Sequence, residues 1–129
     1  MLEVNGKNID ITRGNILPLI IDALNEDETN YEFKPGDILR FTIMEAKNVE
    51  NILLQKDFKV TEASIEQEIT LTADEMKIGE LSSKPIKYWY EVELNPDTKY
   101  TQTIIGYTKD EGAAILTILP EGGDKNDQS

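Results

Sequence analysis

Residues 86–94 alternate between two kinds of side chain along their whole length. One side carries Ile86, Tyr88, Tyr90, Val92 and Leu94, and the other carries Lys87, Trp89, Glu91 and Glu93. Successive side chains of a β-strand point to opposite faces of its sheet, so the pattern predicts a half-buried strand. Because this strand is long, aromatic and one-sided, we expect it at the centre of an antiparallel sheet.

Shorter segments of similar character recur through the chain, separated by turn residues. The other predicted strands are centred on Ile9 and Ile11, on 16–24, on Leu39 to Ile43, and on 53–60, 65–71, 99–107 and 114–119. Residues 110–112 predict a hairpin turn before the last strand, and Thr72 with Glu75 has the spacing of a capping box, which predicts one helical turn. The pattern therefore indicates an all-β antiparallel sandwich of about eight strands.

The alternation within each predicted strand indicates which side chains face inward and form the core. We expect Phe41, Ile43, Leu71, Tyr88, Tyr90 and Val92 to share one core between the two layers. Tyr31 and Phe33 are predicted to attach the long loop 25–37 to that core. Pro18 cannot donate a hydrogen bond to a neighbouring strand, so segment 16–24 is predicted to lie at a sheet edge.

Composition excludes several kinds of chemistry. The chain of 129 residues has no cysteine and no histidine, which removes thiolate sites, imidazole ligands and every histidine-dependent triad. No phosphate-binding glycine loop and no nucleophile elbow is present. We therefore expect no metal or nucleotide cofactor and no enzymatic activity. The formal charge of −12 opposes binding to nucleic acid or anionic lipid, so we expect neither as a partner.

Four residues are candidates for a protein interface: Trp89, Tyr107, Leu17 and Ile20. Trp89 points away from the predicted core and either anchors a partner or packs beneath a loop or a second layer. Tyr107 lies on the second face of strand 99–107, and Leu17 and Ile20 belong to the predicted edge strand. The acidic run 26–28 lacks the spacing and glycine of a calcium loop, so we interpret it as solvated.

Six segments, taken in order, resemble a known family. They are residues 11–15 (Ile-Thr-Arg-Gly-Asn), 36–41 (Gly-Asp-Ile-Leu-Arg-Phe), 69–75 (Ile-Thr-Leu-Thr-Ala-Asp-Glu), 88–94 (Tyr-Trp-Tyr-Glu-Val-Glu-Leu), 101–106 (Thr-Gln-Thr-Ile-Ile-Gly) and 119–122 (Leu-Pro-Glu-Gly). The chain resembles the small immunoglobulin-like proteins of tailed phages and prophages of Gram-positive bacteria, which look like the N-terminal domain of the phage baseplate upper protein. The resemblance implies an immunoglobulin-like sandwich whose last two strands form a closing hairpin.

The resemblance also implies a function. We expect a virion-associated structural protein of the tail or baseplate, or an accessory component, that contacts other virion proteins or itself. The alternative is a β-sandwich module that binds carbohydrate or the host surface. We expect one sandwich domain at 1–120, a disordered acidic tail at 121–129, and a location in the host cytoplasm during synthesis and in the virion afterwards.

Overall fold

The computed structural model describes residues 2–5, 7–79 and 81–121, and within them the chain forms nine strands and no α-helix. The strands are β1 (Leu2–Asn5), β2 (Asn8–Thr12), β3 (Leu17–Ile21), β4 (Ile38–Met44), β5 (Ile52–Lys59), β6 (Gln67–Leu71), β7 (Ile86–Leu94), β8 (Gln102–Ile105) and β9 (Ala114–Leu119). The all-β prediction is confirmed. Strand β1 was not predicted from the sequence.

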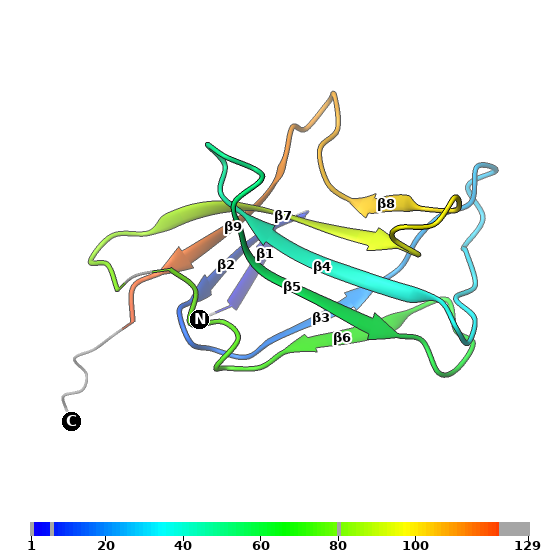
Figure 1. The fold of residues 1–129 in the computed structure, drawn as a ribbon, viewed down its shortest axis with the longest axis horizontal. Coiled ribbons are helices and arrows are strands. Elements are labelled where there is room, and N and C mark those ends of the chain that lie inside the picture. Colours follow the sequence, from blue (N-terminus) through cyan, green and yellow to red (C-terminus); the bar gives the residue numbers. More distant parts are fainter. Residues whose placement is uncertain (1, 6, 80, 122–129) are drawn as a thin grey trace.

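The strands form two layers with the core between them (Figure 1). The larger sheet has the order β1-β2-β9-β7-β4-β5, with β8 also paired to β7, and the smaller sheet pairs β3 with β6. Strand β7 lies at the centre of the larger sheet, as its alternation predicts. The sheets are mostly antiparallel, so the predicted antiparallel sandwich is confirmed as a whole, but it is wrong for one pair, because β2 runs parallel to β9.

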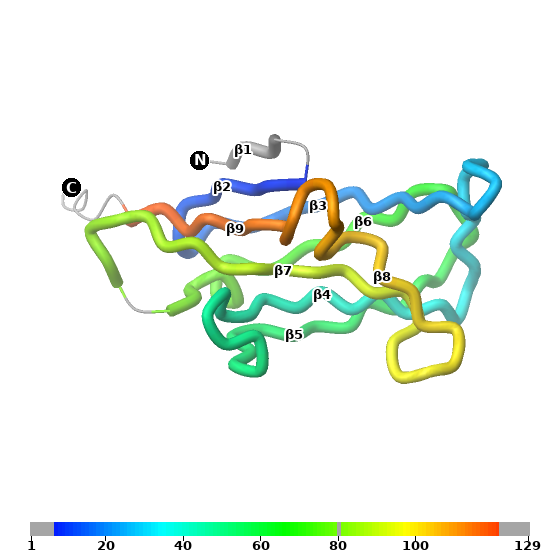
Figure 2. The backbone as a smooth tube through the Cα atoms, turned by 90° about the horizontal axis from the view of Figure 1, so that it is seen from above, coloured from blue at the N-terminus to red at the C-terminus, as the bar shows by residue number. Residues whose placement is uncertain are grey.

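The predicted closing hairpin is also wrong. Strands β8 and β9 follow one another along the same side of β7, and they do not pair with each other (Figure 2). Strand β8 pairs with Val92 to Leu94, and β9 pairs with Ile86 to Tyr90. The nine residues of β7 are long enough to pair with two short strands in succession. Residues 106–113 leave the sheet between them as a projecting loop.

The core contains every residue that the alternation predicts for it. Twenty buried hydrophobic residues from both sheets and from the connecting loops form one cluster, and it includes Phe41, Ile43, Leu71, Tyr88, Tyr90 and Val92. Tyr90 stacks on Phe41, with ring centroids 5.6 Å apart. Phe33 is completely buried and Tyr31 packs beside it, so the predicted attachment of loop 25–37 is confirmed.

The β6–β7 connection begins with the predicted helical turn. The backbone N–H of Thr72 donates to the Glu75 carboxylate at 2.8 Å, and the N–H of Glu75 donates to the Thr72 hydroxyl at 3.2 Å. These two reciprocal bonds are those of a capping box. The turn places Met76 and Ile78 in the core.

Hydrogen bonds from Arg13 link this connection to the turn that follows β2. Its guanidinium donates to the carbonyl oxygens of Ile78 at 3.2 Å and Gly79 at 3.1 Å, and it pairs with the Glu121 carboxylate at 2.7 Å. Glu121 was predicted to begin the disordered tail, and its contact with Arg13 places it on the sandwich instead. The remainder of that predicted tail, residues 122–129, lies outside the described residues.

Candidate functional site

Trp89 lies on the face of the larger sheet that is turned away from β3 and β6, which we call the outer face. Tyr88 and Tyr90 point into the core, so Trp89 between them must point outward. It is half-buried and lies between Met44 of β4 and Ile115 of β9, its partners in register. The structure therefore supports the prediction that the Trp89 side chain points away from the core, and the neighbouring side chains in the sheet are apolar.

Tyr107 is brought to Trp89 by the loop 106–113. The two ring centroids are 6.4 Å apart with an interplanar angle of 37°. Tyr107 is 69% exposed, and the loop 106–113 to which it belongs projects above the larger sheet between β8 and β9 (Figure 1). Two of the four predicted interface residues, Trp89 and Tyr107, thus form one aromatic pair.

The other two predicted interface residues, Leu17 and Ile20, lie in the smaller sheet, and they do not join the aromatic pair. Leu17 is 0% exposed, so its prediction as an interface residue is wrong. Pro18 correctly indicates that β3 is an edge strand. An edge position leaves backbone hydrogen-bonding groups on one side of the strand unpaired. It does not decide which side chains face the core, because that depends on the alternation along the strand. Ile20 is 67% exposed and lies on the outward face of β3.

Lys7 holds both ends of the loop that carries Tyr107. Its ammonium group donates to the carbonyl oxygens of Gly106 at 2.9 Å and Gly112 at 2.8 Å. Within the loop, the backbone groups of Thr108 and Gly112 exchange two hydrogen bonds of 3.0 and 2.9 Å. The Tyr90 hydroxyl donates to the Lys7 carbonyl oxygen and so ties this anchor to the core. Contacts within the chain therefore fix the position of the loop that carries Tyr107.

Glu91 follows Trp89 on the outer face and lies beside the same loop. Its Oε2 atom is 3.9 Å from the position that a Cβ atom would take on Gly106, the residue before Tyr107. Burial raises the pKa of the Glu91 carboxyl, and the charge of Glu93 raises it further. Among the described residues, no hydrogen bond or ion pair to this carboxylate is present.

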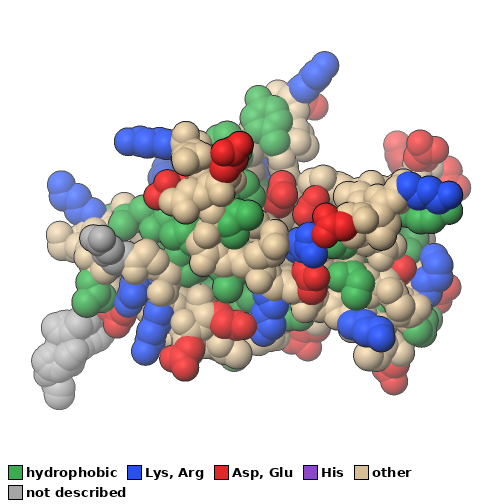
Figure 3. Space-filling view, viewed as in Figure 1, with side chains coloured by type: hydrophobic (Ala, Val, Ile, Leu, Met, Phe, Trp, Pro, Cys, Tyr) green, Lys and Arg blue, Asp and Glu red, His purple; other side chains and the backbone are tan. Residues whose placement is uncertain are grey.

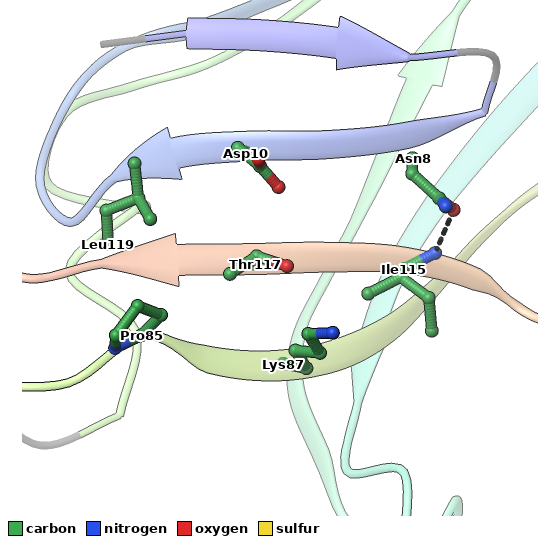
Figure 4. Close-up of a pocket in the computed structure, with 7 residues that line it drawn as sticks. All are labelled: Asn8, Asp10, Pro85, Lys87, Ile115, Thr117 and Leu119. Carbon is green, nitrogen blue, oxygen red and sulfur yellow. Dashed lines mark hydrogen bonds between the residues drawn. The ribbon is translucent and has the colours of Figure 1, made fainter.

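A shallow depression continues the outer face across β2, β9 and β7 (Figure 4). Its volume is about 440 Å³. Asp10, Thr117 and Lys87 form one row across the three strands, because they are register partners. At one end the Asn8 side chain accepts a hydrogen bond of 3.1 Å from the backbone N–H of Ile115. Polar side chains alternate here with Pro85, Ile115 and Leu119, so the lining of the depression is mixed.

The acidic run 26–28 forms a turn in the structure. Both the hydroxyl and the backbone N–H of Thr29 donate to Asp27 Oδ1, at 2.6 and 3.1 Å. The side-chain hydrogen bond from Thr29 is the main cause that lowers the pKa of the Asp27 carboxyl. Within residues 2–5, 7–79 and 81–121, no group of three or more acidic, cysteine or histidine side chains is arranged to hold a metal ion.

The outer face also has a distinct charge pattern. Acidic side chains gather between the projecting loop and β8, a hydrophobic side chain stands on the projection, and a basic side chain stands at its tip (Figure 3). Arg40, the basic residue beside Glu93 in the sheet, is already paired with Asp57 at 2.7 Å and Asp97 at 2.9 Å. The arrangement offers aromatic rings next to an acidic surface, which suits contact with a basic partner.

Sequence reasoning missed Glu91 and Lys7 as parts of this site. The alternation of residues 86–94 places Glu91 outward, but its half-burial depends on a loop from another part of the chain. Lys7 acts across sequence separations of 99 and 105 residues, for which no local pattern exists. Both contributions arise from tertiary structure.

Comparison with protein-family models, curated proteins and solved structures found no match to this chain. The described part of the chain also contains no helix with the length and apolar character needed to cross a membrane.

Proposed function

We propose that the chain is a virion-associated structural protein of a phage or prophage, a tail, baseplate or accessory component that acts through protein–protein contacts. The observation that carries the proposal is the aromatic pair of Trp89 and Tyr107 on the outer face. Aromatic residues are enriched at the centres of protein interfaces, where they supply large contact areas. The anchored loop lowers the conformational entropy that Tyr107 would lose on binding.

The proposal includes an immunoglobulin-like arrangement. In a variable-type immunoglobulin domain, strands G, F, C and C′ are neighbours in one sheet, and strands B and E lie in the other. The order β9-β7-β4-β5 and the pair β3-β6 follow the same plan in the same chain order. Tyr88 near the start of β7 lies against Gly79 of the preceding connection, which is similar to the tyrosine corner of such domains. The smaller sheet departs from the plan because its described part has two strands.

The test of the proposed function is whether the chain is part of assembled particles. Particles from the phage or induced prophage that encodes the chain would be purified on a density gradient and analysed by quantitative mass spectrometry. We expect the chain in the particle fraction at a fixed ratio to the tail proteins. Complete particles that lack the chain, with the chain left in the lysate, would contradict the proposal.

A carbohydrate-binding module is the second candidate, and one observation favours it. Sugar sites stack their ligands on neighbouring exposed rings, and the structure places Tyr107 beside Trp89. The two rings are tilted by 37° and Trp89 is half-buried, so they do not form one flat platform. Titration with host cell-wall polysaccharide distinguishes the candidates, because saturable quenching of Trp89 fluorescence would favour the sugar module.

A further inference from the structure

We infer that the outer face around Trp89, Glu91 and Tyr107 docks an arginine side chain from a basic surface of a partner protein. This inference deepens the proposed protein–protein function and rests on it.

Glu91 lacks an opposite charge beside it in the described part of the fold. Its carboxylate is half-buried against the loop 106–113, and within the described residues no cation pairs with it. Removing a carboxylate from water is unfavourable unless an opposite charge or hydrogen-bond donors replace the lost solvent. A guanidinium group from a partner would supply both, and it would also reduce the repulsion between Glu91 and Glu93.

Two aromatic rings, those of Trp89 and Tyr107, lie next to Glu91. Trp89 precedes Glu91 by two residues on the same face of β7, a separation of about 7 Å along a strand. Tyr107 directly follows Gly106, against which the Glu91 carboxylate lies. A planar guanidinium stacks on indole and phenol rings while its N–H groups reach a neighbouring carboxylate. Lysine has a compact ammonium group without this planar geometry, so the arrangement favours arginine.

Among the described residues, no basic side chain of the chain itself pairs with Glu91. Arg40 is engaged by Asp57 and Asp97, and Lys7 is engaged by the carbonyl oxygens at the ends of the loop. Lys87 lies on the same face of β7, but it is four residues from Glu91, about 13 Å along the strand. Neither Lys87 nor Lys109 of the loop forms an ion pair with a described residue. The formal charge of −12 attracts a basic surface over a longer range and repels phosphate-rich partners. A protein that presents arginine is therefore the partner that both the local site and the overall charge favour.

The experiment uses Trp89 as the reporter, because it is the one tryptophan in the chain. The full chain would be titrated with N-acetyl-arginine amide, and the indole N–H resonance of Trp89 would be followed by NMR. We expect a saturable shift in the millimolar range. N-acetyl-citrulline amide, which has a similar shape and no charge, should produce little shift, and N-acetyl-lysine amide should bind more weakly than the arginine compound.

Glu91→Gln tests the role of the carboxylate, and Glu68→Gln is its matched control. Glu68 is an exposed residue on β6 in the opposite layer, and both variants remove one negative charge. We expect Glu91→Gln to weaken arginine binding by about two- to fivefold, as for a partly exposed charge pair, and Glu68→Gln to leave it unchanged. Spectra of both variants without ligand establish that the fold is retained.

Three results would overturn the inference: an unmoved indole resonance, equal weakening by the two variants, or equal binding of the lysine or citrulline compound. Because the titration needs no particles, these results would not bear on the proposed virion role. Conversely, absence of the chain from particles would leave the titration result unchanged.

Discussion

The hydroxyl group of Tyr88 occupies the space that a Cβ atom on Gly79 would need. Gly79 also has a φ of +69°, a conformation that residues with a side chain rarely adopt. Tyr88 is buried in β7, whereas Gly79 lies in the preceding connection, and the carbonyl oxygen of Gly79 accepts a hydrogen bond from Arg13. The contact therefore joins the start of the central strand to the connection that leads into it.

We expect Gly79→Ala to lower the free energy of unfolding by about 2–4 kcal/mol, from backbone strain and overlap together. Gly112→Ala is the matched control, because Gly112 has a φ of +73° but no atom lies within 4 Å of the position that its Cβ atom would take. For Gly112→Ala, the loss in the free energy of unfolding should come from the backbone strain of the positive φ alone. Urea denaturation measures both values, and equal losses would mean that the Tyr88 contact has no energetic consequence.

Asp37 is the buried acceptor of a hydrogen-bond network at the opposite end of the sandwich. It accepts hydrogen bonds from the Tyr31 hydroxyl at 2.7 Å, the Lys34 backbone N–H at 3.1 Å and the Asn95 side-chain amide at 3.2 Å. Burial acts to raise the pKa of the Asp37 carboxyl, but these hydrogen bonds outweigh it and lower the pKa below the ordinary value of 3.8.

Because the pKa is lowered in the folded state, Asp37 stabilises the protein above its unfolded pKa. That contribution is lost as the pH falls through the folded pKa. We expect Asp37→Asn to lower the free energy of unfolding by about 1–3 kcal/mol at pH 7, with a smaller difference from wild type at pH 2. Asp22→Asn, at an exposed position, should have little effect. A difference that did not change with pH would contradict a role for the ionised carboxylate.

Arg13 and Arg40 have similarly buried side chains, with 16% and 19% exposure, but different partners. Arg13 donates to backbone carbonyl oxygens that hold the β6–β7 connection, whereas Arg40 pairs with two carboxylates at the surface. We expect Arg13→Lys to lower the free energy of unfolding by about 1–2 kcal/mol, and Arg40→Lys by less than about 1 kcal/mol. Thermal denaturation of the two variants would check this order, and the reverse order would contradict it.

The sequence predicts the strands well where alternation and turn residues agree. Strand β7 has the predicted bounds of residues 86–94, and its inward residues lie in the core as expected. The predicted strand 99–107 is shortened because Asn95 and Asp97 adopt positive φ and the hydroxyl of Thr101 donates to the Asn95 carbonyl oxygen. The turn therefore continues for more residues than the pair Asn95-Pro96, from which it is predicted, indicates.

The sequence predicts less of the candidate site than it does of the strands. An outward Trp89 follows from alternation, but its contact with Tyr107 depends on the way β7 pairs with both β8 and β9. Such pairing brings together segments that are distant in sequence, and strand propensity does not specify it. The error at Leu17 has a related origin, since Pro18 indicates an edge but not which face of the strand is buried.

Tyr107 and Tyr100 are both 69% exposed, but Tyr107 alone of the two contacts Trp89. If the aromatic pair docks a virion partner, Tyr107→Ala should reduce recovery of the chain in purified particles by about tenfold or more, as for an interface hot spot. Tyr100→Ala should leave recovery unchanged. Circular dichroism would verify that both variants fold, and equal recovery of the two would remove Tyr107 from the interface.

Glu91 is expected to reduce the stability of the isolated protein at neutral pH. Its folded pKa is raised above the ordinary value of 4.5 by burial and by Glu93. A raised pKa gives a stabilising contribution that is present below the unfolded pKa and is lost as the pH rises through the folded pKa. The ionised carboxylate at pH 7 is therefore unfavourable for folding.

Glu91→Gln should consequently raise the free energy of unfolding at pH 7 by a fraction of a kcal/mol, since solvent screens this half-exposed group. The gain should disappear near pH 3, where wild-type Glu91 is protonated, and Glu68→Gln should not reproduce this pH dependence. Urea denaturation at both pH values would measure it. If Glu91→Gln instead destabilised the protein at pH 7, the carboxylate would have a favourable partner within the fold, and it would not be free to receive an arginine from another protein.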